Sequence, residues 1–277
     1  MNISEFLKAL KAPLYFTSIS PVLIGWAFSS FRISYLVILL LIVTVSMQAG
    51  MNLAMDYFDH NSRRPLRNED TFFPLGSLFI EKYRVNPARV RVSFLTMMLV
   101  AVVAGLIVVY ITRDLILLYF GLFGVFISLL YVIPPIKLGA RGIGELSTFF
   151  SFGPLAVIGT IIAVGGRVSD EAIFVSVSLG LLASAIRYLH HIPEDNPDGR
   201  RVRYFKVIYP ILVIGAPIMI SIFRNIEIPA LIVFAGALIH VAYLPRQPIQ
   251  ISRKTNISVL IHFGFTVLVL VFLALKL

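Results

Sequence analysis

Residues 33–59 read ISYLVILLLIVTVSMQAGMNLAMDYFD, and this stretch decides the fold class. Its first part, 33–55, is an apolar run long enough to cross roughly 30 Å of hydrocarbon as a helix. Its last residues place two carboxylates, Asp56 and Asp59, at the mouth of that helix. Carboxylates are costly at the edge of a membrane unless they pair with cations or line a wet cavity. The stretch therefore predicts a membrane-spanning helix that ends in a functional site.

The composition of the whole chain agrees with a location in lipid. Of its 277 residues 58% are hydrophobic and 14% are charged, whereas soluble domains are roughly 45–50% apolar and about 25% charged. The chain has no Cys, which excludes disulfides and thiolate chemistry. Residues 1–11 lack the apolar core of a secretory signal, and we expect an interfacial lead-in there.

Apolar runs recur along the entire chain. We expect a single integral membrane domain over 1–277, all-α, with nine transmembrane helices around a central cavity. The predicted spans are 13–30, 33–55, 92–112, 115–133, 145–165, 171–190, 205–223, 228–245 and 256–275. Pro21 and Gly153-Pro154 interrupt two of them, and neighbouring helices or waters satisfy the backbone at such breaks.

The basic residues predict the orientation of these spans. With the N-terminus in the cytoplasm, all of the 24 Lys and Arg residues except Arg32, Arg113, Arg167, Arg224 and Lys276 fall on the cytoplasmic side. The positive-inside rule thus predicts a cell-membrane protein with its N-terminus inside and its C-terminus outside. The net charge of +10 is a topology signal, and we expect no nucleic-acid partner.

Two acidic clusters end two of the predicted cytoplasmic spans. In the first, Asn52, Asp56 and Asp59 share a helical face and present the oxygen ligands that Mg²⁺ prefers. The alternative is that they cap the span at the headgroup level. In the second, Glu194 and Asp198 lie in a segment that Pro193 and Pro197 predict to be bent.

Several cationic side chains lie between or before these clusters. His190 and His191 precede the second cluster as candidate bases or phosphate donors, or as interfacial residues; nothing nearby has zinc-ligand spacing. Lys137 and Arg141 either bind diphosphate oxygens or anchor the chain at the membrane surface. Arg187 lies inside an apolar run, so we expect it to face a cavity or a partner, with Glu194 or a bound phosphate as candidates. Glu145, at the start of the fifth span, is expected only to cap its helix.

Together these motifs resemble the UbiA superfamily of intramembrane prenyltransferases, most closely the branch that prenylates 1,4-dihydroxy-2-naphthoate. The matching residues are Gln48, Gly50, Asn52, Leu53, Asp56, Tyr57 and Asp59, then the run from Tyr131 to Glu145, then Phe152 to Ala156, and finally His190 to Asp198. The resemblance covers about residues 13–205 in order.

The resemblance implies a Mg²⁺-dependent transfer of a polyprenyl group from an isoprenoid diphosphate to a small aromatic quinone precursor. By residue, it implies a catalytic set of Asp59, Asp198, Lys137 and Arg141, a substrate-binding set of Asn52, Tyr131, Arg187, His190 and His191, and a metal-binding set of Asp56, Asp59, Glu194 and Asp198. The apolar spans would hold the isoprenoid tail next to the lipid bilayer. No pattern in the sequence indicates an oligomeric state.

Departures from the family pattern keep other functions open. Met55 stands where the family has an Asn, and the later Asp expected around 63–65 is missing. In Met55 we see either a weakened metal site or an apolar wall beside the isoprenoid. Prenylation of glyceryl phosphate and an altered isoprenoid-binding homologue are both alternatives. A secondary transporter is a weaker one, because transporters place such charges near the midplane whereas both acidic clusters here sit at one face.

Overall fold

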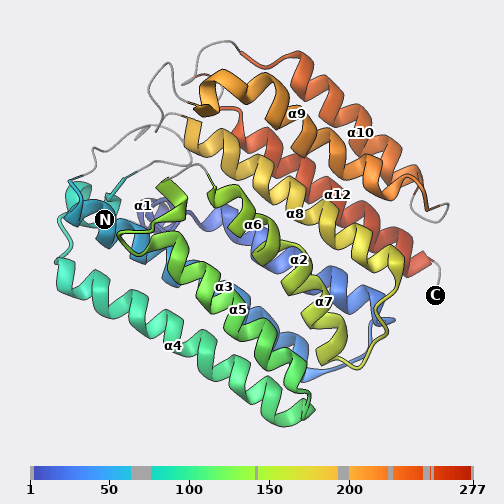
Figure 1. Cartoon of the computed structure of the whole chain (residues 1–277), viewed down its shortest axis with the longest axis horizontal. Coiled ribbons are helices and arrows are strands. Elements are labelled where there is room, and N and C mark those ends of the chain that lie inside the picture. The colour runs from blue at the N-terminus through green and yellow to red at the C-terminus, as the bar shows by residue number, and fades with distance from the viewer. Residues whose placement is uncertain are drawn as a thin grey trace.

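The chain folds into a bundle of roughly aligned helices, seen in the computed structural model of Figure 1. The structure describes residues 3–63, 76–140, 143–192, 200–223, 227–245, 250 and 253–275. Within these ranges its α-helices are α1 (Ile3–Ala9), α2 (Phe16–Phe28), α3 (Tyr35–Asn61), α4 (Pro87–Thr112), α5 (Leu115–Val132), α6 (Gly144–Phe152), α7 (Pro154–Ala163), α8 (Asp170–His191), α9 (Arg200–Ile220), α10 (Glu227–Ala242) and α12 (Thr255–Leu275). The prediction of an all-α fold is confirmed.

Among the described residues, fewer helices are long enough to cross a membrane than the sequence predicts. Seven segments of the described chain are long and apolar enough to cross a membrane, counting α6 and α7 together as one. The apolar helices α2 and α10 fall in the predicted ranges 13–30 and 228–245 but are shorter than a full span. Turns take up the ends of both predicted ranges, so fewer residues are helical than the apolar runs suggest.

Two local features of the helices follow directly from the sequence. α3 continues six residues beyond the predicted limit of 55, to Asn61, and so carries Asp56 and Asp59 on its last turns. Gly153 separates α6 from α7, and Pro154 is the first residue of α7. Proline at the first helical position costs nothing, because its missing N–H would have no partner within the helix.

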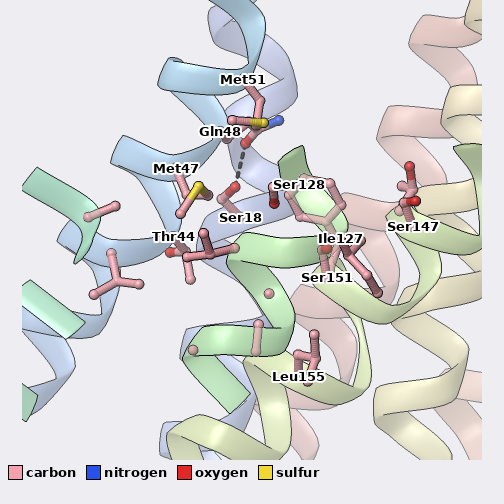
Figure 2. A pocket seen from close by; sticks show the side chains of 18 of the residues that line it. Ser18, Thr44, Met47, Gln48, Met51, Ile127, Ser128, Ser147, Ser151 and Leu155 are labelled. Atoms are coloured by element: carbon pink, nitrogen blue, oxygen red, sulfur yellow. Dashed lines mark hydrogen bonds between the residues drawn. The ribbon is translucent and has the colours of Figure 1, made fainter. Parts of the chain in front are cut away.

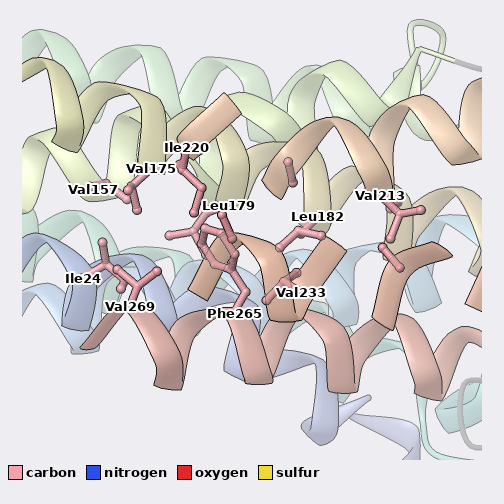
Figure 3. Packing of buried hydrophobic residues seen from close by; sticks show 14 of the residues in the cluster. Ile24, Val157, Val175, Leu179, Leu182, Val213, Ile220, Val233, Phe265 and Val269 are labelled. Atoms are coloured by element: carbon pink, nitrogen blue, oxygen red, sulfur yellow. The ribbon is translucent and has the colours of Figure 1, made fainter. Parts of the chain in front are cut away.

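One half of the bundle is solidly packed. α2, α7, α8, α9, α10 and α12 share a cluster of fully buried apolar side chains, among them Leu179, Phe265 and Val269 (Figure 3). Glycines allow close approach of the helices here: a Cβ on Gly180 of α8 would lie 2.6 Å from the carbonyl oxygen of Phe149 on α6. Small residues at helix contacts are the usual route to tight packing in lipid, where hydrophobicity gives no drive for association.

The other half, formed by α3, α4 and α5, is more open. Only 11% of the apolar stretch of α5 is buried, against 78% of that of α8. Its cores are two smaller clusters, one around Val37 and Val108 and one around Leu53 and Phe94. The second cluster lies near the end of the bundle that carries α1, the last turns of α3, α5 and α8, and the first turns of α4 and α6 (Figure 1). We call this the α1 end.

Candidate functional site

A cavity of about 420 Å³ lies between the open half and α6, α7 and α8. Figure 2 shows Met47 and Met51 of α3 on one side of it and Ile127 of α5 and Ser147 of α6 on the other. Its deep part is lined by apolar residues of α4, α5 and α7. Its α1 end is polar and is lined by Lys11, Asn52, Tyr131, Arg187, His190 and His191. The predicted substrate-binding residues thus share one cavity, which Lys11 joins.

Asp59 and Lys137 come together from distant parts of the chain. Lys137 Nζ lies 2.8 Å from Asp59 Oδ1, and the side chains are 13% and 4% exposed respectively. The turn after α5 allows this contact, because Lys137 adopts a left-handed backbone conformation with φ 38°. The pair places a carboxylate and an ammonium group side by side, which are the groups that bind a metal and a phosphorylated ligand respectively. The pair lies next to the cavity rather than in its lining.

Arg187 is the best-connected polar side chain of the cavity. Its Nε donates to the Tyr131 hydroxyl at 2.9 Å, its Nη2 donates to the Gly139 carbonyl at 2.7 Å, and its Nη1 forms an ion pair with Glu145. A Cβ on Gly144 would lie 2.5 Å from Arg187 Cζ, so glycine at this position makes room for the guanidinium. Four residues of the 131–145 run are therefore explained by one cation.

This arrangement corrects the expected role of Glu145. The sequence predicts that Glu145 caps its helix and that Glu194 or a phosphate pairs with Arg187. In the structure, Arg187 forms an ion pair with Glu145. A buried Arg held by three partners is a fixed positive charge that cannot lose its proton.

Two further polar side chains of α3 bind the N-terminal segment. Asn52 donates through Nδ2 to the Leu10 carbonyl at 3.0 Å, and Gln48 donates to the Leu14 carbonyl at 3.1 Å. Gln48 also accepts a hydrogen bond from Ser18, visible in Figure 2. These contacts hold the residues between α1 and α2 against the cavity. They explain why Asn52 lines the cavity and also has a partner in the protein.

Asp56 is 5% exposed and is turned towards residues 77–80, which follow the loop after α3. It accepts hydrogen bonds from Ser77 Oγ at 2.6 Å, from Phe79 N at 2.9 Å and from Ile80 N at 3.4 Å. It is not part of the cavity lining. Its role as a metal ligand stays a prediction, whereas its hydrogen bonds hold residues 77–80 against α3.

The histidine pair ends α8. His190 and His191 are each 3% exposed, and their rings meet edge to face with centroids 4.7 Å apart. Their burial rules out a simple position at the membrane surface. Both rings line the polar end of the cavity near Arg187.

Part of the predicted site lies outside the described residues, namely Arg141, Glu194 and Asp198. Within the described ranges, no three His, Asp or Glu side chains converge as a metal site would require. Two of the predicted ligands, Glu194 and Asp198, lie outside these ranges, and the predicted metal-binding set stays a prediction. The chemistry of this donor set fits the ion, because Mg²⁺ takes one or two carboxylates and completes its shell with water and substrate phosphate.

Comparisons with known proteins support the resemblance. No family model matches the sequence. The 2-carboxy-1,4-naphthoquinone phytyltransferase of Synechocystis sp. is 24% identical and covers 93% of this chain and 89% of its own. A 1,4-dihydroxy-2-naphthoate octaprenyltransferase of Mycobacterium leprae is 25% identical over 73% of this chain and 68% of its own.

Two solved structures share the fold along nearly the whole chain. A digeranylgeranylglyceryl phosphate synthase superposes with a TM-score of 0.63 at 15% identity, covering 99% of this chain and 98% of that one. A UbiA homolog from Archaeoglobus fulgidus, bound to GPP and Mg²⁺, superposes with a TM-score of 0.62 at 13% identity, covering 96% and 99%. At such identities the two structures establish the fold alone.

Proposed function

Because this chain belongs to the UbiA family of intramembrane prenyltransferases, we propose that it transfers a prenyl group from an isoprenoid diphosphate to a naphthoate-type quinone precursor. One observation carries the proposal. A long apolar cavity within a multi-pass bundle is polar and cationic at one end only, where Arg187 and Lys11 line it and the Asp59–Lys137 pair adjoins it. A prenyl diphosphate has the same division into an apolar tail and an anionic head.

The diphosphate head binds at the α1 end. Lys137, together with Arg141 and Arg187, supplies positive charge as the bond between the allylic carbon and the diphosphate oxygen breaks. Mg²⁺, held by Asp59, Glu194 and Asp198, would neutralise further charge on the leaving diphosphate when it is bound. These are the predicted roles of the acidic clusters, and Asp198 is expected to face Asp59 across the cavity mouth.

The cavity controls what the allylic cation meets. Its apolar walls from α4, α5 and α7 exclude water, so that the electron-rich ring of the acceptor forms the new carbon–carbon bond and then loses a proton. His190 and His191 line the polar end, where they bind the acceptor. The names of the two sequence relatives favour a naphthoate acceptor over glyceryl phosphate.

The orientation in the membrane follows from the charges. We propose that the α1 end faces the cytoplasm, since Lys82 and Lys137, two described residues of the loops predicted to be cytoplasmic, lie at this end. Soluble diphosphates and Mg²⁺ are then supplied from the same side as the polar end of the cavity.

Incubation of the purified protein with Mg²⁺ and labelled geranylgeranyl diphosphate tests the function, against 1,4-dihydroxy-2-naphthoate and glyceryl phosphate acceptors in parallel. We expect a prenylated naphthoate by mass, lost on chelation and lost in Lys137→Ala but not in Lys82→Ala, an exposed lysine near the same end. Product from glyceryl phosphate alone would overturn the naphthoate proposal in favour of ether-lipid chemistry. Donor binding without any product would identify an isoprenoid-binding homologue.

A further inference from the structure

The side chain of Asp56 on α3 connects this helix to residues 77–80, which lie more than 20 positions further along the chain. Its oxygens accept hydrogen bonds from Ser77, Phe79 and Ile80, two of them from backbone N–H groups. A carboxylate that accepts several N–H and O–H bonds fixes the conformation of the donors, because each bond requires its own direction. Asp56 thus determines how the chain re-enters the bundle before α4.

The segment held by Asp56 is a short helical turn, η2 (Leu78–Lys82). Leu78, Phe79 and Ile80 are at most 5% exposed and pack into the cluster around Leu53. A second tie comes from His60 of α3, which contacts Glu81. η2 is therefore docked on α3 by one buried carboxylate and by one partly exposed hydrogen bond between His60 and Glu81.

η2 in turn supports the N-terminal helix. The Phe79 ring meets the Phe6 ring of α1 edge to face, with centroids 6.0 Å apart, and Ala9 of α1 belongs to the same apolar cluster. At the far end of α1, the Leu10 carbonyl accepts the hydrogen bond from Asn52. α1 is consequently held through Phe6 in its middle and through Leu10 directly after its last residue, and the first of these contacts depends on η2.

Lys11 follows α1 and enters the cavity. It is 6% exposed, has a left-handed backbone conformation with φ 56°, and lines the cavity near Arg187. Asp56 lies close enough to attract its ammonium group. The Lys11 side chain thus adds a second positive charge, beside that of Arg187, to the lining of the polar end of the cavity.

We propose that Asp56 is a positioning residue: by docking η2 and thereby α1, it holds Lys11 at the polar end of the cavity, where Lys11 binds the diphosphate of the donor. This inference rests on the proposed function for the identity of the ligand. It differs from the predicted metal-ligand role of Asp56, because here the carboxylate acts through the protein and not through the ion.

Hydrogen–deuterium exchange and donor binding, measured on the full-length protein, test the proposal. The variants are Asp56→Asn, Ser77→Ala and Lys11→Ala, with Ser62→Ala as the matched serine control, since Ser62 bonds only within α3. Binding of labelled geranylgeranyl diphosphate is measured over a Mg²⁺ titration, without acceptor. Neither readout requires turnover, so a failure to transfer the prenyl group would overturn the proposed function while leaving the positioning role testable.

We expect Asp56→Asn and Ser77→Ala to speed amide exchange in residues 78–82 and in α1. They should also weaken donor binding by about 10-fold and about 3-fold, the loss expected for hydrogen bonds to a charged group, with no shift of the Mg²⁺ midpoint. Lys11→Ala should weaken donor binding by about 10-fold or more without faster exchange in 78–82. Ser62→Ala should change neither quantity.

Three results would overturn the proposal. A shift of the Mg²⁺ midpoint in Asp56→Asn with unchanged exchange would make Asp56 a metal ligand. Faster exchange with unchanged donor binding in Asp56→Asn, or unchanged donor binding in Lys11→Ala, would reduce the contacts of Asp56 to a purely structural role.

Discussion

The packed half and the open half of the bundle differ in what surrounds their polar side chains. Both consist of apolar helices, but in the packed half the buried polar groups bond to one another, as Tyr209 does with Ser258 at 2.7 Å and Ser20 with His262 at 2.7 Å. In the open half and at its border, polar groups line a cavity or hold the segments that shape it. A buried polar side chain alone therefore does not indicate the site, whereas polar side chains that line a cavity do.

Two individual glycines differ in their surroundings in the same way. Gly180 brings two helices into contact, whereas Gly124 on α5 has no atom within 4 Å of the position of a Cβ. The matching residues from Gln48 to Asp59 lie on α3 in the open half, and His190 and His191 lie on α8, which borders both halves. α8 thus presents its apolar residues to the packed core and Arg187 to the cavity.

Removal of Arg187 should have the largest effect on stability and on transfer, since this residue connects α8 to α6 and to the turn after α5. In Arg187→Met, Glu145 loses its buried cation, and we expect a loss of about 3–5 kcal/mol in the free energy of unfolding together with loss of transfer. Thermal unfolding in detergent and product formation measure the two effects. Arg187→Lys retains the charge but not the fork, so it should keep more stability than activity.

Arg113→Met provides the control for this prediction. Arg113 is exposed at the end of α4 and lies over the Tyr110 ring at 4.3 Å. It resembles Arg187 in contacting a tyrosine but borders no cavity, and its loss should change stability by less than about 1 kcal/mol. Equal losses in both variants would contradict the assignment of Arg187 as the central tie.

Asp59 and Lys137 should have a large effect on the transfer rate, and breaking their buried ion pair should also cost stability, as it does for Arg187. We expect Asp59→Asn and Lys137→Met each to lower the transfer rate by about 10²–10³-fold, as loss of one preorganised charge at a developing anion does. The double variant should lose less than the product of the two, since the partners act on one another. Rates are compared with Asp114→Asn, which alters a helix cap at the other end of α5. If the double variant lost the full product of the two single rate losses, Asp59 and Lys137 would act independently of one another.

A matched pair of glycine substitutions measures the packing difference itself. Gly180→Ala pushes a methyl group against a backbone oxygen, and we expect it to destabilise the protein by about 1–3 kcal/mol. Gly124→Ala meets open space, and the lower backbone freedom of alanine should stabilise the helix by about 0.5–1 kcal/mol. Unfolding temperatures in one detergent compare the two. Destabilisation of similar size in both would show that α5 is as tightly packed as α8.

The apolar runs predicted most of the fold, because lipid forces each backbone to satisfy its own hydrogen bonds as a helix. Helices lie in all nine predicted ranges, and the break at Gly153-Pro154 is where the sequence indicated it. The limits of the elements were harder to predict. α3 continues to Asn61 because polar residues tolerate helix geometry once they have partners at the α1 end, which hydropathy does not register.

The candidate site was predicted as a set of residues but not as a set of pairs. The sequence identified Lys137 and Asp59, yet their contact joins residues 78 positions apart and depends on how α3 and α5 pack. Glu145 was missed as the partner of Arg187 for the same reason. Lys11 was missed because it counted only as one of many topology charges, although its burial distinguishes it from them.

Met55 has the smallest expected effect and separates two interpretations of the open half. The family resemblance predicts that Met55→Asn restores a metal-ligating amide one turn before Asp59 and tightens the Mg²⁺ dependence. The structure places Met55 in the cavity lining and against the apolar cluster around Leu53, so a buried amide there would cost binding energy. We expect donor affinity to fall by about 3–10-fold with an unchanged Mg²⁺ midpoint, while Met55→Leu, which keeps the volume, behaves like wild type. A lower Mg²⁺ midpoint with equal or faster transfer in Met55→Asn would favour the ligand interpretation instead, and would place the metal site on the face of α3 that lines the cavity.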